Sequence, residues 1–146
     1  MKKIIILLFF FNQAHAQFPT KNDLVICSLS LVAGAANGVE EAIKFHYNTG
    51  FAFVHPYASR QFWDPRLSYI NKDRSAFTRL IPTFSDGYHL MRGISRTLLI
   101  ANVAISVTEM KAKNLLLKIA KKFVISMLAN RAGQFLTYDL IYKEKK

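Results

Sequence analysis

The sharpest candidate for chemistry in the sequence is a carboxylate three residues before an imidazole, at Asp86 and His89. Residues three apart share one face of a helix, so this pair is spaced to bind one metal ion or to act as an acid–base pair. Glu40, Glu41 and His46 follow an earlier apolar stretch, whose end we expect to face the start of the second helix. Glu41, His46, Asp86 and His89 together would supply the oxygen and nitrogen ligands of a divalent-metal site.

The same residues also have an ordinary structural interpretation. In it, Asp86 caps a helix and His89 forms a hydrogen bond within a polar seam. An Asp-x-x-His pair alone is a weak motif, and neither a Gly-x-Ser-x-Gly nucleophile motif nor a Cys-x-x-Cys pair occurs in the sequence. We therefore favour a protein without a cofactor that is not an enzyme, and we keep a metal-dependent hydrolase as the alternative.

Three arginines form a second candidate group, because they lie on the polar stripes of two predicted helices: Arg92, Arg96 and Arg131. Arginine binds phosphate or carboxylate through two parallel hydrogen bonds. The three side chains are thus candidates for anion binding, for example of a lipid headgroup. The alternative is a solvated face, or ion pairs with acidic residues such as Glu40, Asp86 and Asp139.

Ser30, Gly34 and Gly38 recur every four residues and therefore lie on one face of the first predicted helix. Small residues at this spacing allow another backbone to approach closely, a pattern typical of membrane helices. Because glycine in a helix interior costs stability, we expect this face to pack against a partner helix, in a homo-oligomer or otherwise. A tightly packed soluble bundle is the alternative.

The elements that must position these residues are three long helices, which predict an all-α fold. The first is expected from Leu24, the second from an N-cap at Ser85, and the third over 114–142. Between the first two, residues 47–84 hold three prolines and many aromatic residues without helical periodicity. We expect a lobe of loops and short helical turns there, packed over the helix ends.

The N-terminus has the pattern of a secretory signal peptide. Lys2 and Lys3 precede an apolar run over 4–11, and Ala14 and Ala16 form a small-x-small cleavage site. Cleavage would leave one helical domain over 17–146. The protein is therefore predicted to be exported, to the periplasm or the cell membrane. The single cysteine, Cys27, cannot form a disulfide within the chain and is expected to be buried.

The chain is basic, with 20 Lys+Arg against 9 Asp+Glu. Removing residues 1–16 takes away two lysines, which leaves 18 against 9 and a net charge of +9. Such an excess favours an anionic partner; for an exported protein we expect a membrane or anionic lipid surface, met by the basic segment 111–122, and not nucleic acid. In the three predicted helices the longest uncharged stretches span 16, 12 and 8 residues (24–39, 97–108 and 123–130), each shorter than the usual membrane span of about 20.

Five short blocks in fixed order resemble a pattern in small, uncharacterised exported or membrane proteins of the Bacteroidetes: Gly34-Ala-Ala-Asn-Gly-Val-Glu-Glu41, Phe62-Trp-Asp-Pro65, Ser68-Tyr-Ile-Asn-Lys72, Ser85-Asp-Gly-Tyr-His89 and Gly133-Gln-Phe-Leu-Thr-Tyr138. The chain departs from that pattern at Asp64, Tyr69 and Asp73, where the family has Asn, Trp and Tyr. The resemblance implies a multi-helix, membrane-associated protein and transfers no activity. The function predicted from the sequence is thus a non-enzymatic structural or interaction protein of the cell envelope.

Overall fold

The computed structural model describes residues 20–70, 81–108 and 115–143. Within these residues every regular element is helical, which confirms the all-α prediction. Three helices are long: α2 (Lys21–Phe45), α7 (Gly87–Thr108) and α8 (Leu115–Gln134). The last of these continues as the π-helical segment η3 (Phe135–Tyr142).

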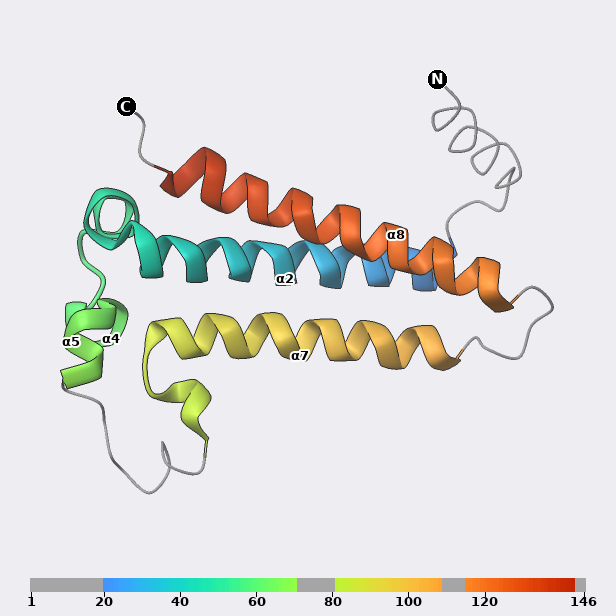
Figure 1. The fold of residues 1–146 in the computed structure, drawn as a ribbon, viewed down its shortest axis with the longest axis horizontal. Helices are drawn as coiled ribbons and strands as arrows, with labels where there is room; N and C mark the ends of the chain where they lie inside the picture. Colours follow the sequence, from blue (N-terminus) through green and yellow to red (C-terminus); the bar gives the residue numbers. More distant parts are fainter. Residues whose placement is uncertain (1–19, 71–80, 109–114, 144–146) are drawn as a thin grey trace.

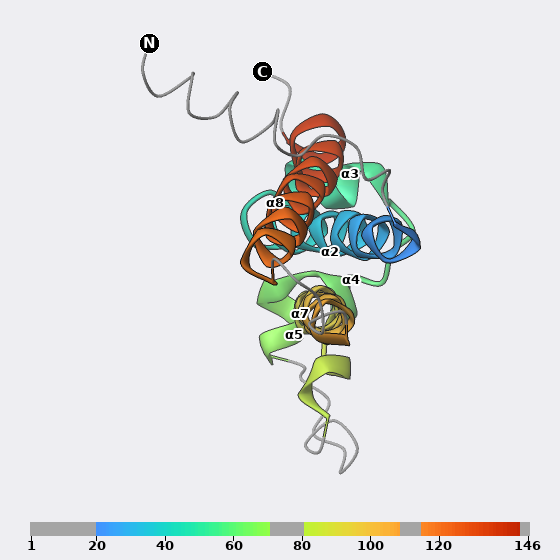
Figure 2. The same ribbon diagram turned by 90° about the vertical axis from the view of Figure 1, so that its right-hand side faces the viewer.

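The three long helices form a row in which α2 is the middle member (Figures 1 and 2). Both α7 and α8 pack extensively on α2 but contact each other at few residues. In Figure 1, α8 runs in the same direction as α2, whereas α7 runs in the opposite direction. Because α7 and α8 lie on opposite sides of α2, their outer faces have no neighbour within the described chain.

Helix α2 begins one turn before the predicted start because Thr20 is its N-cap. The Thr20 hydroxyl accepts a hydrogen bond from the backbone N–H of Asp23 at 3.2 Å, and the Asp23 carboxylate accepts the Thr20 N–H at 3.0 Å. This reciprocal pair is a capping box, which satisfies two backbone donors that the first helical turn leaves without partners.

Residues 47–84 contain short helical turns joined by loops, as predicted, and most of their described part is helical. Its elements are short: η1 (Tyr47–Phe51), α3 (Ala52–Val54), α4 (Arg60–Trp63), α5 (Pro65–Ile70) and the 3-10 turn η2 (Pro82–Phe84). They contact the C-terminal end of α2 and the N-terminal end of α7. The predicted position over the helix ends is therefore correct, although residues 71–80 lie outside the described part.

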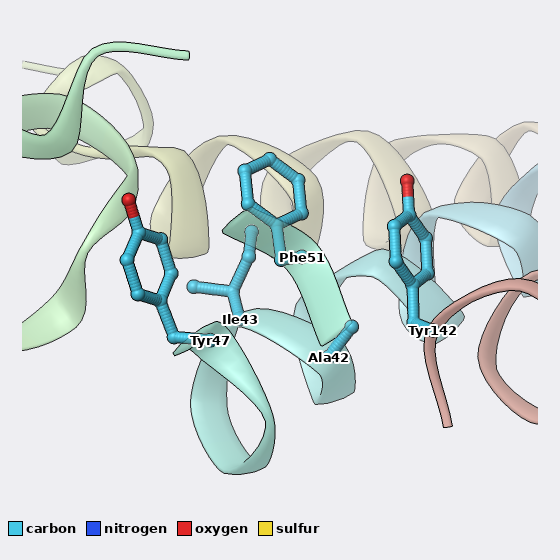
Figure 3. Close-up of a cluster of buried hydrophobic side chains, with 5 residues drawn as sticks. All are labelled: Ala42, Ile43, Tyr47, Phe51 and Tyr142. Carbon is cyan, nitrogen blue, oxygen red and sulfur yellow. The ribbon is translucent and has the colours of Figure 1, made fainter. Parts of the chain in front are cut away.

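The main apolar core lies at this same end of the molecule. It consists of Ala42, Ile43, Tyr47, Phe51 and Tyr142, which come from α2, η1 and η3 (Figure 3). Phe51 stacks on Tyr142 with ring centroids 5.8 Å apart. The aromatic residues of this core thus fasten η1 and η3 to the end of α2.

Candidate functional site

Along the length of the helices, the side chains turned inward are small or polar. Ser30 and Ser95 are fully enclosed, and the described helices also bury Asn102, Asp23 and Lys122. Beside them lie small residues: Ala33, Gly34, Ala36, Gly38, Ala129 and Gly133. Large apolar side chains are rare in this interior, where Ile26 is the main example.

The large apolar side chains of the same helices face outward. On α7, Ile100 and Val103 are 69% and 64% exposed, and on α8, Leu116 and Phe123 are 82% and 66% exposed. Many others share this orientation: Leu24, Val25, Leu31, Val32, Val107, Leu117, Val124, Met127, Leu128, Phe135 and Leu136. A water-soluble protein rarely exposes contiguous apolar areas of this extent. The polar-inside, apolar-outside arrangement is therefore the most informative feature of the described structure.

The small residues of α2 allow a close helix crossing. A Cβ atom built on Gly34 would lie 1.9 Å from the carbonyl oxygen of Asn130, and one built on Gly133 would lie 2.0 Å from that of Leu31. The Ser30/Gly34/Gly38 face is therefore covered by α8 and η3 of the same chain. The helices that meet this face within the described chain are α8 and η3, whose atoms fill the space that the glycines leave.

A layer of hydrogen bonds joins all three long helices near their middle. The Asn102 amide donates to the Ser30 hydroxyl at 2.6 Å, and the Ser30 and Ser126 hydroxyls lie 2.7 Å apart. The Asn130 amide also donates to the Ser30 carbonyl at 3.4 Å. Because interhelical hydrogen bonds fix the register of packed helices, this layer aligns α7 and α8 on α2.

An ion pair lies at the N-terminal end of α2. The Lys121 ammonium is 2.7 Å from the buried Asp23 carboxylate, which also belongs to the capping box. Lys122, next along α8, is buried as well. The first turn of α2 and the second turn of α8 are thus tied together by charge.

Asp86 and His89 are in direct contact, as their spacing predicts. Both carboxylate oxygens of Asp86 lie 2.8–2.9 Å from the Nδ1 atom of His89. The Asp86 carboxylate also accepts the His89 backbone N–H at 2.9 Å, which makes Asp86, and not Ser85, the N-cap of α7. The structural interpretation, in which Asp86 caps the helix, is therefore correct.

The predicted four-residue metal site is not formed. Glu41 accepts a hydrogen bond from the Gln134 amide at 2.8 Å, and the His46 ring packs against Tyr138. In the described residues, no three His, Cys, Asp or Glu side chains are grouped to hold a metal ion. This alternative fails because Glu41 faces Gln134 of α8 and Glu40 lies beside Arg92 of α7, while Asp86 is engaged in capping α7.

The three candidate arginines are divided between two sides of α2. Arg92 donates to the Tyr88 hydroxyl at 3.2 Å and lies 3.9 Å from the Glu40 carboxylate, whereas Arg131, on α8, donates to Gln134 at 2.8 Å. Arg96 is exposed on α7. Because α7 and α8 lie on opposite sides of α2, these residues do not form the single anion-binding cluster that the sequence suggested.

A polar hollow of about 190 Å³ lies between the C-terminal end of α2 and α8. Its lining mixes both signs of charge: Asn37, Glu40, Glu41, Lys44, Phe45 and Gln134. A second hollow of similar size, lined by Asp64, Arg66 and the η1 backbone among others, shares Lys44 and Phe45 with the first. Only the packing of the helices places both hollows beside Lys44, so its position in the sequence gives no signal for this site.

Two buried phenols support the aromatic end of the molecule. The Tyr142 hydroxyl and the Nε2 atom of His55 share a hydrogen bond of 2.7 Å, which ties the end of η3 to α3. Burial raises the pKa of Tyr142 above its usual value. Burial and the nearby Asp64 carboxylate raise the pKa of Tyr47, against the Arg60 guanidinium, which lowers it. Both phenols therefore keep their protons at neutral pH.

Cys27 is exposed on α2, which corrects the expectation that it is buried. It lies on the outward side of the helix, with Leu24 and Leu31. The predicted signal peptide, with Ala14 and Ala16, falls outside the described residues.

Two of the described helices, α2 and α7, are long and apolar enough to cross a membrane. Comparison of the chain with protein-family models, with curated proteins and with solved structures finds no match.

Proposed function

We propose that the protein is a membrane-embedded, non-enzymatic helical protein of the cell envelope, in which α2, α7 and α8 act as one three-helix unit. The observation that carries this proposal is the inverted distribution of side chains along these helices. Apolar side chains facing outward are favourable in lipid, whereas in water they would form a large exposed apolar surface. Serine, asparagine and glycine at the helix contacts are the residues that hold helices together where no hydrophobic effect acts between them.

The positions of the charged residues at the two ends of the helices also support embedding of this three-helix unit in a membrane. Asp23, Lys121 and Lys122 lie at one end of the unit, and Glu40 and Arg92 at the other. The uncharged stretch of α2 between these ends has 16 residues, which is about 24 Å of helix. This length is somewhat less than the hydrocarbon thickness of about 30 Å. Long lysine and arginine side chains can extend toward the headgroups, and local thinning of the bilayer can absorb the remainder.

The proposal also includes export through a cleaved signal peptide. It further includes contact of the basic segment 111–122 with anionic lipid. Lysines near a membrane surface are attracted to anionic headgroups. Lys118, Lys121 and Lys122 occur in the first two turns of α8. The basic segment would therefore lie near the headgroup level if the helices cross the bilayer.

Membrane fractionation tests the proposal directly. We expect the tagged full-length protein to stay in the membrane pellet after an alkaline carbonate wash and to be released only by detergent. Peripheral proteins are released by that wash because they are held by charge alone. Recovery of the protein in the wash, or in the soluble periplasmic fraction, would contradict the proposal.

A further inference from the structure

The polar hollow between the C-terminal end of α2 and α8 has a composition that restricts its ligand. Glu40 and Glu41 contribute two carboxylates, and Lys44 contributes one ammonium group. The hollow therefore presents both signs of charge at its surface. A ligand with a single charge would meet a like charge on entering it, whereas a zwitterion could satisfy both.

Polar and charged side chains from α8 and α7 lie next to the two carboxylates of the hollow. On the α8 side, Arg131 donates to Gln134, and Gln134 donates to Glu41. On the α7 side, the Arg92 guanidinium lies 3.9 Å from Glu40, a distance too long for a hydrogen bond. Glu40 thus lies near a cation, whereas Glu41 contacts the neutral Gln134 amide, and each carboxylate keeps an oxygen for which no hydrogen bond within the described chain is assigned.

Lys44 is the cation that lines the hollow. Within the described residues its ammonium group packs over the Phe45 ring, 4.7 Å from the centroid, and makes no ion pair. It borders both hollows. Phe45 is itself 62% exposed. An unpaired ammonium beside an exposed aromatic ring is suited to a phosphate group attached to an apolar molecule.

We infer that this hollow binds the headgroup of an aminophospholipid of the phosphatidylethanolamine type. Its primary ammonium donates hydrogen bonds to Glu40 and Glu41, and its phosphate lies against Lys44. The inference rests on the proposed membrane embedding, which places the end of the uncharged stretch of α2, and so this hollow, at headgroup level. A choline headgroup carries the same charges but has no N–H to donate, so the site distinguishes the two lipids by hydrogen bonding.

Lipid retention by the purified full-length protein tests the inference. The protein is extracted into mild detergent with an equimolar mixture of phosphatidylethanolamine, phosphatidylcholine and phosphatidylglycerol, and bound lipids are counted by native mass spectrometry. We expect ethanolamine lipid to be retained roughly tenfold over choline lipid, since a hydrogen bond to a charged group is worth about one factor of ten in binding. The double variant Glu40→Gln/Glu41→Gln should reduce this preference to near one.

Asp139→Asn is the matched control. It also removes a carboxylate near the C-terminal end of the bundle, but Asp139 is paired with Lys143 at 3.3 Å and does not line the hollow. We expect this variant to keep the preference. Circular dichroism and gel filtration of each variant separate a lost site from a lost fold.

Two results would overturn the inference: equal retention of ethanolamine and choline lipids by the wild-type protein, or an unchanged preference for ethanolamine over choline lipid in the folded double variant. Failure of the membrane proposal is distinguished by the carbonate wash. A protein that resists the wash but shows no headgroup preference refutes the lipid site alone. If the wash releases the protein, the membrane embedding is refuted, and the lipid site that rests on it is refuted as well.

Discussion

At the scale of single residues, Gly34 controls how closely α2 and α8 approach. A Cβ atom at this position would lie within 3 Å of three backbone atoms of Asn130. Backbone atoms cannot move aside as a side chain can, so any larger residue must separate the two helices. Separation would also pull apart the Ser30 and Ser126 hydroxyls one turn away.

We predict that Gly34→Ala lowers the free energy of unfolding by about 1 kcal/mol or more, because overpacking outweighs the gain in helix propensity. Gly34→Leu should prevent stable folding. Titration with a denaturing detergent, followed by circular dichroism, measures both effects. Gly93→Ala is the control, since its added methyl group would meet the Thr83 side chain, which can rotate away. Equal stability of Gly34→Leu and wild type would refute the close crossing.

Asp86 is the second residue whose role is testable, because the structure assigns it to capping. Asp86→Ala removes the acceptor for the His89 backbone N–H and should cost about 0.5–2 kcal/mol in the free energy of unfolding. Asp86→Asn keeps an oxygen acceptor there and should stay within a few tenths of a kcal/mol of wild type. The same denaturation measurement compares the two. If both variants lose the same stability, the carboxylate acts through its charge on His89 and not as a cap.

At the scale of elements, α7 is the helix whose surroundings best distinguish a membrane-embedded protein from a protein in water. It packs on α2 through a narrow contact face, where it buries Ser95 and Asn102, and turns Ile100, Val103 and Val107 outward. Nothing in the described chain covers this outer face. A helix with polar residues at its contact and apolar residues outside reverses the pattern of a surface helix in water.

Labelling of engineered cysteines tests what surrounds α7. In a Cys27→Ser background, Val103→Cys in native membranes should react much more slowly with a charged maleimide than Tyr57→Cys, because the reagent and the thiolate both require water. Val103 and Tyr57 are 64% and 99% exposed, so exposure in the structure does not by itself explain slow labelling. Similar rates at the two sites would indicate that the outer face of α7 lies in water.

At the scale of the whole molecule, the aromatic end is the part whose stability depends on alkaline pH. Burial raises the pKa of Tyr142 above its usual 10.0, so the folded state holds this proton more tightly than the unfolded state does. The stabilisation is complete below pH 10 and is lost as pH rises through the higher pKa of the folded state. The free energy of unfolding should therefore decrease above about pH 10.

Tyr142→Phe isolates this contribution. The variant loses the hydrogen bond to His55 and should be less stable at neutral pH by about 1 kcal/mol. Its stability should also decrease less steeply between about pH 10 and 12, since one raised phenol has been removed. Detergent-denaturation curves at several pH values give both quantities. An alkaline slope identical to that of wild type would show that Tyr142 ionises without cost in the folded protein.

The helical elements of this protein and some of its local contacts could be predicted from the order of its residues. Helical periodicity located the three long helices to within a few residues, and the three-residue spacing brought Asp86 and His89 together. These features depend on neighbours along the chain, which periodicity and spacing report directly. The four-residue spacing of Ser30, Gly34 and Gly38 also depends on neighbours along the chain, and it correctly indicated a close helix crossing.

Only the tertiary structure decided which helix fills that crossing and which groups meet across α2. It placed Glu41 against Gln134 and away from Asp86, and it separated Arg92 from Arg131. It also exposed Cys27 and brought Lys44 between two hollows. The physical reason is that a helix with a given sequence pattern can pack in different rotations about its long axis. The side chains that face a neighbour are therefore fixed only when α8, α2 and α7 pack together.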